Sequence, residues 1–313
     1  MEGIMANVGK SLAVAVCACV LGSGIEVAGQ DSGSQVLKSL STEAYRSVAE
    51  KAHRGNAAAQ TIVGVAYALA IHERRDDSQA VYWFEKAAKK GDPDGQLNLA
   101  RMYDMGLGVP KNLATAARWY ERAAEQGVLA AQYELAGYYL HGSGVEVDPE
   151  KAAKWYEVCA RRGLAEAQYV LGTMYEHGVG VAQDKEQAVR WFREAASAGI
   201  PQAQNSLGLA YLRGWLPEED HTQALMWFLK AAQQGHIGAE VNAALLYAHG
   251  HCMPRDLVKA YAWTEIARKA KAQQAERLLA QWSQEMTGEQ IEIALRQARE
   301  LQPRIEQARA SLH

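Results

Sequence analysis

The chain contains few prolines, phenylalanines and cysteines. Its 313 residues include 7 Pro, 3 Phe and 4 Cys, whereas Ala, Leu, Glu, Gln, Arg and Lys are abundant. This composition favours helices over sheets. Beyond Cys19 only Cys159 and Cys252 are present, too few for the even, regularly spaced set of cysteines that a disulfide framework needs. The sequence therefore predicts an all-α protein whose stability comes from packing.

The chain also lacks an excess of positive charge. Its formal net charge is −3 at pH 7, and its pI is about 6.3. A surface that neutralises several phosphates needs clustered Lys and Arg. Nucleic acid and anionic membrane surfaces are therefore disfavoured as partners.

The N-terminal apolar run, residues 11–21, is well short of the roughly 20 residues that a transmembrane helix needs. Lys10 precedes this run and small residues follow it, which is typical of a secretory signal. We predict that residues 1–29 are a cleaved signal peptide and residues 30–37 a flexible lead. The mature chain would then be periplasmic or secreted, without a stable membrane span. Lipoprotein anchoring through Cys19 is a less favoured alternative.

Tryptophan and tyrosine recur with a fixed period. Six of the eight tryptophans are separated by steps of 36 residues, and six tyrosines follow the same step without an insertion. Self-similarity at a fixed period indicates a repeat architecture. The residues are Trp83, Trp119, Trp155, Trp191, Trp227 and Trp263, and Tyr67, Tyr103, Tyr139, Tyr175, Tyr211 and Tyr247.

Each unit is predicted to form a helical hairpin, as the fourth unit illustrates. Apolar residues at three- and four-residue steps, including Leu171 and Tyr175, predict a first helix. This helix would end at Gly178, because glycine tolerates the left-handed geometry of helix ends. Asp184 would then cap the N-terminus of a second helix, which ends at Gly199. Small side chains let the two helices approach closely, and the repeated Trp and Tyr fill the gap to the next hairpin.

The pattern Ala-Gln-x-x-Leu-Gly-x-x-Tyr-x-x-Gly-x-Gly-Val, followed by Ala-x-x-Trp-Phe-x-x-Ala-Ala-x-x-Gly, resembles the SEL-one-like repeat, a tetratricopeptide-like family. The resemblance covers residues 58–271 as six units. It implies an all-α fold, a right-handed α-solenoid of six 36-residue helical hairpins. Solenoids need helical caps at both ends, which we place at residues 38–57 and 272–313.

Three loops depart from the family pattern. The first unit has Ala70-Ile71-His72 where Gly-x-Gly belongs, and the fifth and sixth have Trp215-Leu216 and His251-Cys252. We expect these loops to be reshaped.

The sequence carries no recognisable metal-binding or catalytic motif. His141, His177 and His249 share one repeat position, but packed helices lie roughly 8 to 10 Å apart, so these side chains cannot share an ion with bonds of about 2 Å. Ser-x-x-Lys, Ser-Asp-Asn and Lys-Thr-Gly, which mark β-lactam-active enzymes, are absent. Cys159 is expected to be a buried packing residue, whereas Cys252 lies in a loop and could be a reactive thiol. We expect no catalytic residues, metal or cofactor.

The predicted binding surface is the concave wall that first helices form in such solenoids. By resemblance to tetratricopeptide repeats, the inward positions lie around the Leu-Gly pair and at the turn after Tyr, and their chemistry changes from unit to unit. Tyr133 and Tyr169 would anchor a peptide between charged groups. Ordinary solvated side chains are the alternative for each residue. The predicted partner-binding residues are Arg101, Asp104, Tyr133, Tyr169, Glu176, His177 and Asn205.

The sequence thus favours an exported scaffold or adaptor that binds a protein or peptide and is not an enzyme. Two alternatives stay open. The chain could bind cell-wall peptidoglycan or an envelope polysaccharide, with tyrosines stacked on sugar rings. Less favoured is a β-lactam-active enzyme, an activity linked to some cysteine-rich relatives of the family.

Overall fold

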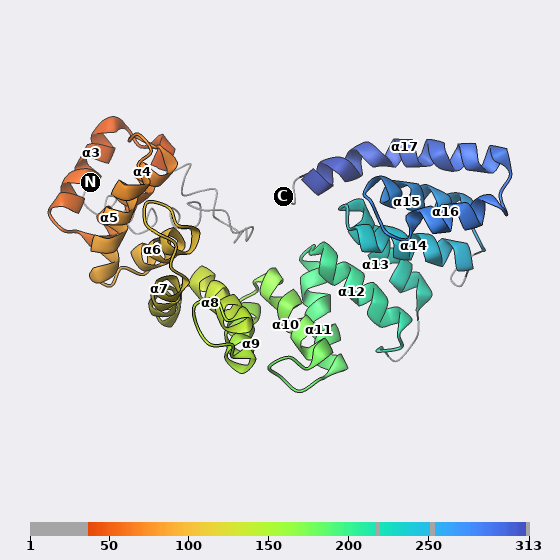
Figure 1. The fold of residues 1–313 in the computed structure, drawn as a ribbon, viewed down its shortest axis with the longest axis horizontal. Coiled ribbons are helices and arrows are strands. Elements are labelled where there is room, and N and C mark those ends of the chain that lie inside the picture. Colours follow the sequence, from red (N-terminus) through yellow and green to blue (C-terminus); the bar gives the residue numbers. More distant parts are fainter. Residues whose placement is uncertain (1–36, 217–219, 251–253, 311–313) are drawn as a thin grey trace. The chain divides into compact units, whose positions relative to one another are not determined.

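The computed structural model describes residues 37–216, 220–250 and 254–310 (Figure 1). The predicted signal peptide and most of the predicted lead lie outside these residues. The described chain is helical and has no strand, and it forms six consecutive hairpins, so the predicted all-α, six-hairpin solenoid fold is confirmed.

The helices fall into two alternating sets, flanked by extra helices at both ends. The first helices of the hairpins are α4 (Ala57–Leu69), α6 (Pro93–Met105), α8 (Leu129–His141), α10 (Ala165–His177), α12 (Pro201–Leu212) and α14 (Ile237–His249). The second helices are α5 (Asp77–Lys89), α7 (Leu113–Glu125), α9 (Pro149–Arg161), α11 (Lys185–Ser197), α13 (His221–Gln233) and α15 (Leu257–Lys269). The flanking helices are α3 (Thr42–His53), α16 (Ala275–Ser283) and α17 (Gly288–Ala310).

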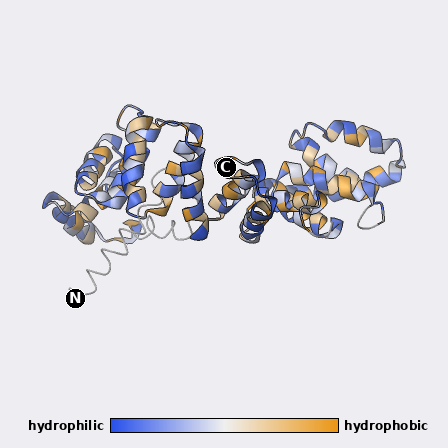
Figure 2. Ribbon diagram, turned by 90° about the horizontal axis from the view of Figure 1, so that it is seen from below, coloured by the Kyte–Doolittle hydropathy of each residue, from blue (hydrophilic) through white to orange (hydrophobic). Residues whose placement is uncertain are grey.

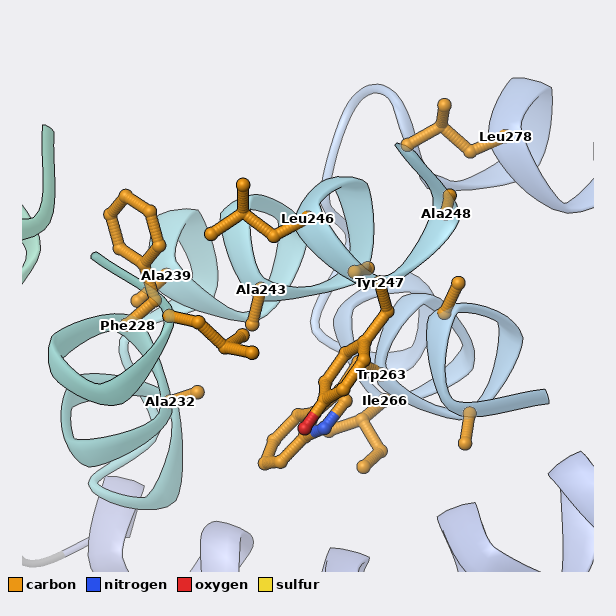
Figure 3. Close-up of a cluster of buried hydrophobic side chains, with 14 of the residues drawn as sticks. Phe228, Ala232, Ala239, Ala243, Leu246, Tyr247, Ala248, Trp263, Ile266 and Leu278 are labelled. Atoms are coloured by element: carbon orange, nitrogen blue, oxygen red, sulfur yellow. The ribbon is translucent and has the colours of Figure 1, made fainter. Parts of the chain in front are cut away.

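Packing divides the chain into two compact units. Unit 1 holds α3 to α9 with residues 179–181, and unit 2 holds α10 to α17. Apolar and polar residues are mixed along the helices of both units (Figure 2), as expected for helices that each bury one stripe. In unit 2, side chains of α13, α14, α15 and α16 meet in one cluster around Phe228, Tyr247 and Trp263 (Figure 3).

The second helices begin at the predicted capping residues. The Asp184 carboxylate accepts a hydrogen bond from the Gln187 amide at 2.9 Å, which satisfies a donor that has no partner within the helix. Equivalent bonds are made by Asp76, Asn112, Asp148, Asp220 and Asp256. The N-caps predicted from the sequence are therefore confirmed.

The second glycine of each Gly-x-Gly loop lies against the preceding hairpin. Gly144 has a φ of 71°, and a Cβ placed on it would lie 2.3 Å from the carbonyl carbon of Leu113 at the start of α7. Gly108 and Gly180 make the same close approach to Asp77 and Pro149. Both the left-handed backbone and the missing side chain therefore require glycine there.

The first hairpin keeps this loop geometry without glycine. Ala70 and His72 adopt left-handed φ angles of 56° and 61°, and α5 begins at Asp77 as in the other units. The His72 ring stacks on Tyr45 of α3 at 4.8 Å and bonds to the Leu37 carbonyl oxygen at 2.9 Å. The expected reshaping of the backbone does not occur here, and the side chain of His72 contacts Tyr45 and Leu37. In the fifth unit Trp215 and Leu216 are described, and Gly214 before them keeps a left-handed φ of 63°. Residues 217–219 and 251–253, with Cys252, lie outside the described residues.

In the first five hairpins the residue after the repeat tryptophan is a buried aromatic, whereas only some of the tryptophans are buried. Phe84, Phe192 and Phe228 are 0% exposed, and Tyr120 is 1% exposed. Trp119, Trp155 and Trp227 are only half-buried, and cations lie over two of them: Arg122 over Trp119 at 4.6 Å and Lys230 over Trp227 at 4.1 Å. The prediction that the tryptophans fill the gaps needs this correction, because part of the set lies at the solvent boundary.

The buried phenylalanines are matched by glycines on the facing first helix. A Cβ at Gly172 would lie 2.7 Å from the Phe192 ring, and one at Gly208 would lie 2.6 Å from the Phe228 ring. Gly64 and Phe84 repeat this arrangement. In the two hairpins that carry Tyr120 and Tyr156 instead, the equivalent first-helix residues are Ala100 and Ala136. The first helix therefore carries glycine where the second helix carries phenylalanine, and alanine where it carries tyrosine.

Adjacent hairpins are also joined by buried glutamines. The Gln132 Nε2 donates to the Ala124 carbonyl oxygen of the preceding hairpin at 3.0 Å. Gln60, Gln96 and Gln204 make the same bond to Ala52, Ala88 and Ala196. Each of these carbonyls lies near the end of its helix and also accepts a hydrogen bond from the amide of the glycine that follows, as Ala124 does from Gly127 at 2.9 Å.

The last hairpin has a glutamate in this position, and α17 supplies its partner. Arg309 donates to the Gly235 carbonyl oxygen at 3.1 Å and to Glu240 at 2.6 Å. Arg162 makes the equivalent contacts inside unit 1, to the Gly127 carbonyl oxygen and to Gln132. In the sixth hairpin, Arg309 of α17 thus makes the contacts that a residue at the end of the hairpin's own second helix, Arg162 after α9, makes in the third.

Candidate partner-binding site

The candidate site is built on the side of each first helix that faces away from its hairpin core. We call it the first-helix face and define it by Tyr133, Glu134, Gly137, Leu140 and His141 of α8 and by the equivalent positions of the other first helices. In α8 these residues are half-buried or exposed, whereas Leu135 and Ala136 between them are buried. Helical geometry therefore places them on the outer side.

In unit 1 the structure moves one predicted contact into the interior. Arg101 is only 4% exposed, so it is not displayed on the surface as a partner contact would be. It lies near Tyr120, whose pKa is raised by burial and by Glu134 and lowered by Arg101. A cation at this depth needs neighbouring acidic groups. Arg101 therefore belongs to an internal charged cluster.

Asp104 is half-buried at the edge of this cluster. Burial raises the pKa of Tyr138, and the Asp104 carboxylate raises it further. Asp104 thus faces both the surface and the interior of unit 1.

The two predicted tyrosine anchors pack against the core aromatic residues of their own hairpins. Tyr133 lies edge-on to Tyr156, with ring centroids 5.3 Å apart. In unit 2, Tyr169 lies 6.0 Å from Phe192 at a tilt of 36°. Both tyrosines are half-buried. Each ring is therefore held in place from behind and presents its remaining surface outward.

In unit 2, the polar residues of the first-helix face are linked from one repeat to the next. Glu176 forms an ion pair with Arg213 at 3.1 Å, and Arg213 is 49% exposed. The Nδ2 of Asn242 donates to Oδ1 of Asn205 at 2.9 Å. His177 is exposed, and its Nδ1 lies 3.0 Å from the Thr173 carbonyl oxygen. Glu176, His177 and Asn205 thus lie on the face to which the sequence assigned them.

Asn242 was not among the predicted residues, although a sequence signal for it exists. Both linked pairs are separated by 37 residues, one more than the repeat. A residue therefore pairs with the residue one position after its equivalent in the next hairpin. Applied to Asn205, this step identifies Asn242.

Two hollows adjoin α14 on this face of unit 2. The first, of about 310 Å³, is lined by Leu212, His221, Asn242, Leu245, Leu246 and His249. The second, of about 280 Å³, is lined by Ile237, Gly238, Val241, Asn242, Leu245, Ala272, Gln273 and Gln274. Asn242 and Leu245 line both hollows and form the ridge between them.

Within the described part of the chain, no group of three His, Cys, Asp or Glu residues could hold a metal ion. The described helices also include none that is long and apolar enough to cross a membrane. Cys159 is buried, and burial raises the pKa of its thiol to about 12. The thiol is therefore a packing group, as expected, and not an activated nucleophile.

The fold and this face define a helical-hairpin repeat protein. The family model of the Sel1 repeat matches residues 57–92, 93–128, 129–164, 165–200, 201–236 and 238–271. The chain belongs to the Sel1 repeat family, and the predicted family resemblance is confirmed.

Solved structures of similar proteins agree with this family assignment. A Sel1 repeat protein from Oxalobacter formigenes is 31% identical with a TM-score of 0.60, over 74% of this chain and 91% of that one. A protective antigen of uropathogenic Escherichia coli strains, described as displaying an SLR fold, is 28% identical with a TM-score of 0.60, over 91% of this chain and 71% of that one. Among curated proteins, no significant match was found.

Proposed function

We propose that the protein is an exported, non-catalytic scaffold that binds a protein or peptide partner on its concave, first-helix face. Sel1 repeat proteins are in general protein-interaction scaffolds. The proposal extends this general role to one face and to a location outside the cytoplasm. Export rests on the N-terminal sequence pattern, which lies outside the described residues.

The observation that carries the proposal is the contrast between two kinds of repeat position. Core positions keep one chemistry, such as the aromatic residue at Phe192 and at its equivalents in the other four of the first five hairpins, since the packing of the hairpins depends on them. The surface position of Tyr133 instead carries Tyr169, Asn205 and Val241 in the next three hairpins. Sequence variation at these half-buried positions suits recognition of one specific partner, because the stability of the fold does not require a particular side chain there.

The test is capture of partners by the purified chain from an envelope fraction of its host, with Tyr133→Ala and Tyr169→Ala combined. Rigid aromatic side chains are frequent anchors in interfaces, and losing one commonly costs 1 to 2 kcal/mol or more, which is roughly a 5- to 30-fold weaker affinity. Tyr82→Ala is the matched control, because Tyr82 is 46% exposed on a second helix.

Specific loss of a captured protein with the double variant, with an unchanged helical circular-dichroism spectrum, supports the proposal. Capture that survives in the double variant and disappears with Tyr82→Ala would place the partner on the second helices. Pelleting with cell-wall sacculi, or hydrolysis of nitrocefin, would instead favour polysaccharide binding or an enzyme.

A further inference from the structure

The C-terminal helix α17 has two parts that are held differently. Within unit 2 it packs against α15 and α13 (Figure 1). The part before Pro303 buries Ala294 and Ala298, whereas among residues 303–310 only Ile305 is buried. A proline has no backbone N–H, so Pro303 removes one helical hydrogen bond between the two parts. We call residues 303–310 the α17 strap.

The surface beneath the first part of α17 is adapted to a helix that covers it. Ala262 and Ile266 of α15 are buried and belong to the same apolar cluster as the buried alanines of α17. The equivalent residues of α13, Met226 and Lys230, are exposed. The first part of α17 is therefore a lasting cover of α15, and the strap depends on other contacts.

The strap is anchored by Arg309 at the junction of α13 and α14. The Nε of Arg309 donates to the Gly235 carbonyl oxygen at 3.1 Å, and Nη2 donates to Oε1 of Glu240 at 2.6 Å. Glu240 is 0% exposed, and its Oε2 is buried without a hydrogen-bond partner among the described residues. An ionised carboxylate away from water is stable only when its oxygens are paired. The closed strap therefore satisfies one oxygen of an ionised Glu240 and not the other.

The repeat position of Glu240 is one where the other hairpins have a hydrogen-bond donor. The first five hairpins carry a buried glutamine there, and the Gln132 amide donates to the Ala124 carbonyl oxygen at 3.0 Å. A carboxyl group has a donor only while it is protonated. Burial raises the pKa of Glu240 to about 7, although Arg309 opposes this shift. Near neutral pH the side chain therefore changes from a glutamine-like group to a buried anion.

Arg309 is the charged group that acts on Glu240. His236, one turn earlier, accepts a hydrogen bond from the Ala239 amide at 3.1 Å, and burial lowers its pKa, so it adds no positive charge near pH 7. On the strap itself, Arg304 and Glu306 are exposed. The cations in the last turns of α13 and α15 contact other side chains: Lys230 lies over Trp227, Arg268 is paired with Glu265, and Lys269 is bonded to Gln302.

We propose that the α17 strap is a pH-dependent latch, closed over the end of α13 while Glu240 is protonated and opened when Glu240 ionises. The first part of α17 stays on α15 in both states. The proton leaves to water, and the open strap lets water reach the carboxylate. The closed state binds this proton more tightly than the open state does. The contribution of Glu240 to closure is therefore full below pH 4.5 and is lost as the pH rises through about 7. This inference goes beyond the proposed binding face and does not depend on it.

The experiment is hydrogen exchange of the full chain at pH 5 and pH 8, measured by mass spectrometry. Each rate is divided by that of an unstructured peptide at the same pH, which removes the intrinsic acceleration by base and leaves the protection of each amide. The shift of the Glu240 pKa from 4.5 to about 7 predicts that protection of the strap falls roughly 10- to 100-fold between the two pH values. Protection of residues 288–301 should not change.

Three variants assign the effect. Glu240→Gln introduces the residue of the other hairpins, so the strap should stay closed and keep at pH 8 the protection that the unmodified chain has at pH 5. Arg309→Ala removes the anchor and should lower protection of the strap at both pH values. Glu306→Gln makes the same carboxyl-to-amide change at an exposed residue of the strap and should leave the pH dependence as it is.

Three results would overturn the inference. Protection of the strap that is equal at pH 5 and pH 8, or that falls as much in Glu240→Gln as in the unmodified chain, removes Glu240 as the controlling group. Loss of protection along all of α17 at pH 8 shows that the helix leaves as one piece and that no separate strap exists. A pH dependence that disappears with Glu306→Gln places the controlling carboxyl on the strap and not beneath it.

Discussion

Replacing Gly172 by alanine should destabilise the protein, although alanine is the better helix former. Gly172 lies inside α10 and is buried against Phe192 of α11. A Cβ there would lie 2.7 and 2.8 Å from two ring carbons and 3.3 Å from the Ala188 carbonyl oxygen. The added methyl group can be accommodated only if the ring or a helix moves.

Two opposing effects decide the magnitude. Alanine in place of glycine inside a helix contributes about 0.5 to 1 kcal/mol. Overpacking a close-packed core costs about 1 to 3 kcal/mol. We therefore expect Gly172→Ala to destabilise unit 2 by a net amount on the order of 1 kcal/mol.

The matched control is Gly137→Ala in α8. Gly137 is also a helical glycine, but its nearest neighbour would be the Tyr156 hydroxyl oxygen at 3.4 Å, an ordinary contact. This change should stabilise unit 1 by about 0.5 to 1 kcal/mol. Because repeat arrays do not always unfold in one step, the assay is hydrogen exchange of the amides in α10, α11 and α8, combined with urea denaturation.

The opposite signs at two helical glycines test the reasoning. In a Phe192→Leu background the clash at position 172 is relieved, so Gly172→Ala should there become neutral or stabilising. If Gly172→Ala and Gly137→Ala shift the urea midpoint in the same direction, close packing between Gly172 and Phe192 does not control the hairpin.

Further predictions concern the C-terminal end and the aromatic rows. Burial raises the pKa of Glu240 from 4.5 to about 7, although Arg309 opposes this shift. The folded state then holds the proton more tightly than the unfolded state, so the contribution of Glu240 to stability is full below pH 4.5 and is lost as the pH rises through about 7. Glu240→Gln should flatten the fall in thermal stability between pH 5 and 8, and an unchanged slope would refute the assignment. Arg309→Ala should speed hydrogen exchange in the last turns of α17, since its bonds to Gly235 and Glu240 are lost; protection equal to that of the unmodified chain would show that α17 docks without them. Tyr156→Ala should lower the free energy of unfolding by about 3 to 5 kcal/mol and Trp155→Ala by clearly less, because Tyr156 is 4% exposed and Trp155 is only half-buried. Equal losses in urea titrations would show that Trp155 contributes as much to the core as Tyr156.

The hairpins and their ends could be predicted because local chemistry determines them. A capping carboxylate such as Asp184 acts within three residues of its own position, and Gly178 ends its helix through its own φ of 68°. Both effects are visible in a short stretch of sequence, and the fixed period shows that they recur.

The candidate site was only partly predictable from the sequence, because the burial of a side chain depends on the helices that pack against it. Arg101 and Thr173 occupy equivalent repeat positions, yet Arg101 is buried and Thr173 is half-buried. Of the two carboxylates that act on the neighbouring Tyr120, Asp104 belongs to the helix of Arg101 and Glu134 to α8. Glu240 shows the same limit, since its partner Arg309 lies 69 residues further along the chain and outside the periodic pattern.

The pairing of a small first-helix residue with a core aromatic has a consequence for how such arrays change in length. Gly172 and Phe192 belong to the same repeat, so duplication or deletion of a whole repeat carries both partners. Two recurring contacts between repeats use backbone atoms, the Ala124 carbonyl oxygen that Gln132 reaches and the Leu113 backbone beside Gly144, and backbone atoms are present whatever the sequence of the repeat. Recombination at repeat boundaries therefore preserves packing, whereas a crossover inside a hairpin would combine alanine with phenylalanine and produce a clash. The repeat is thus the unit in which this protein can be lengthened, shortened or recombined.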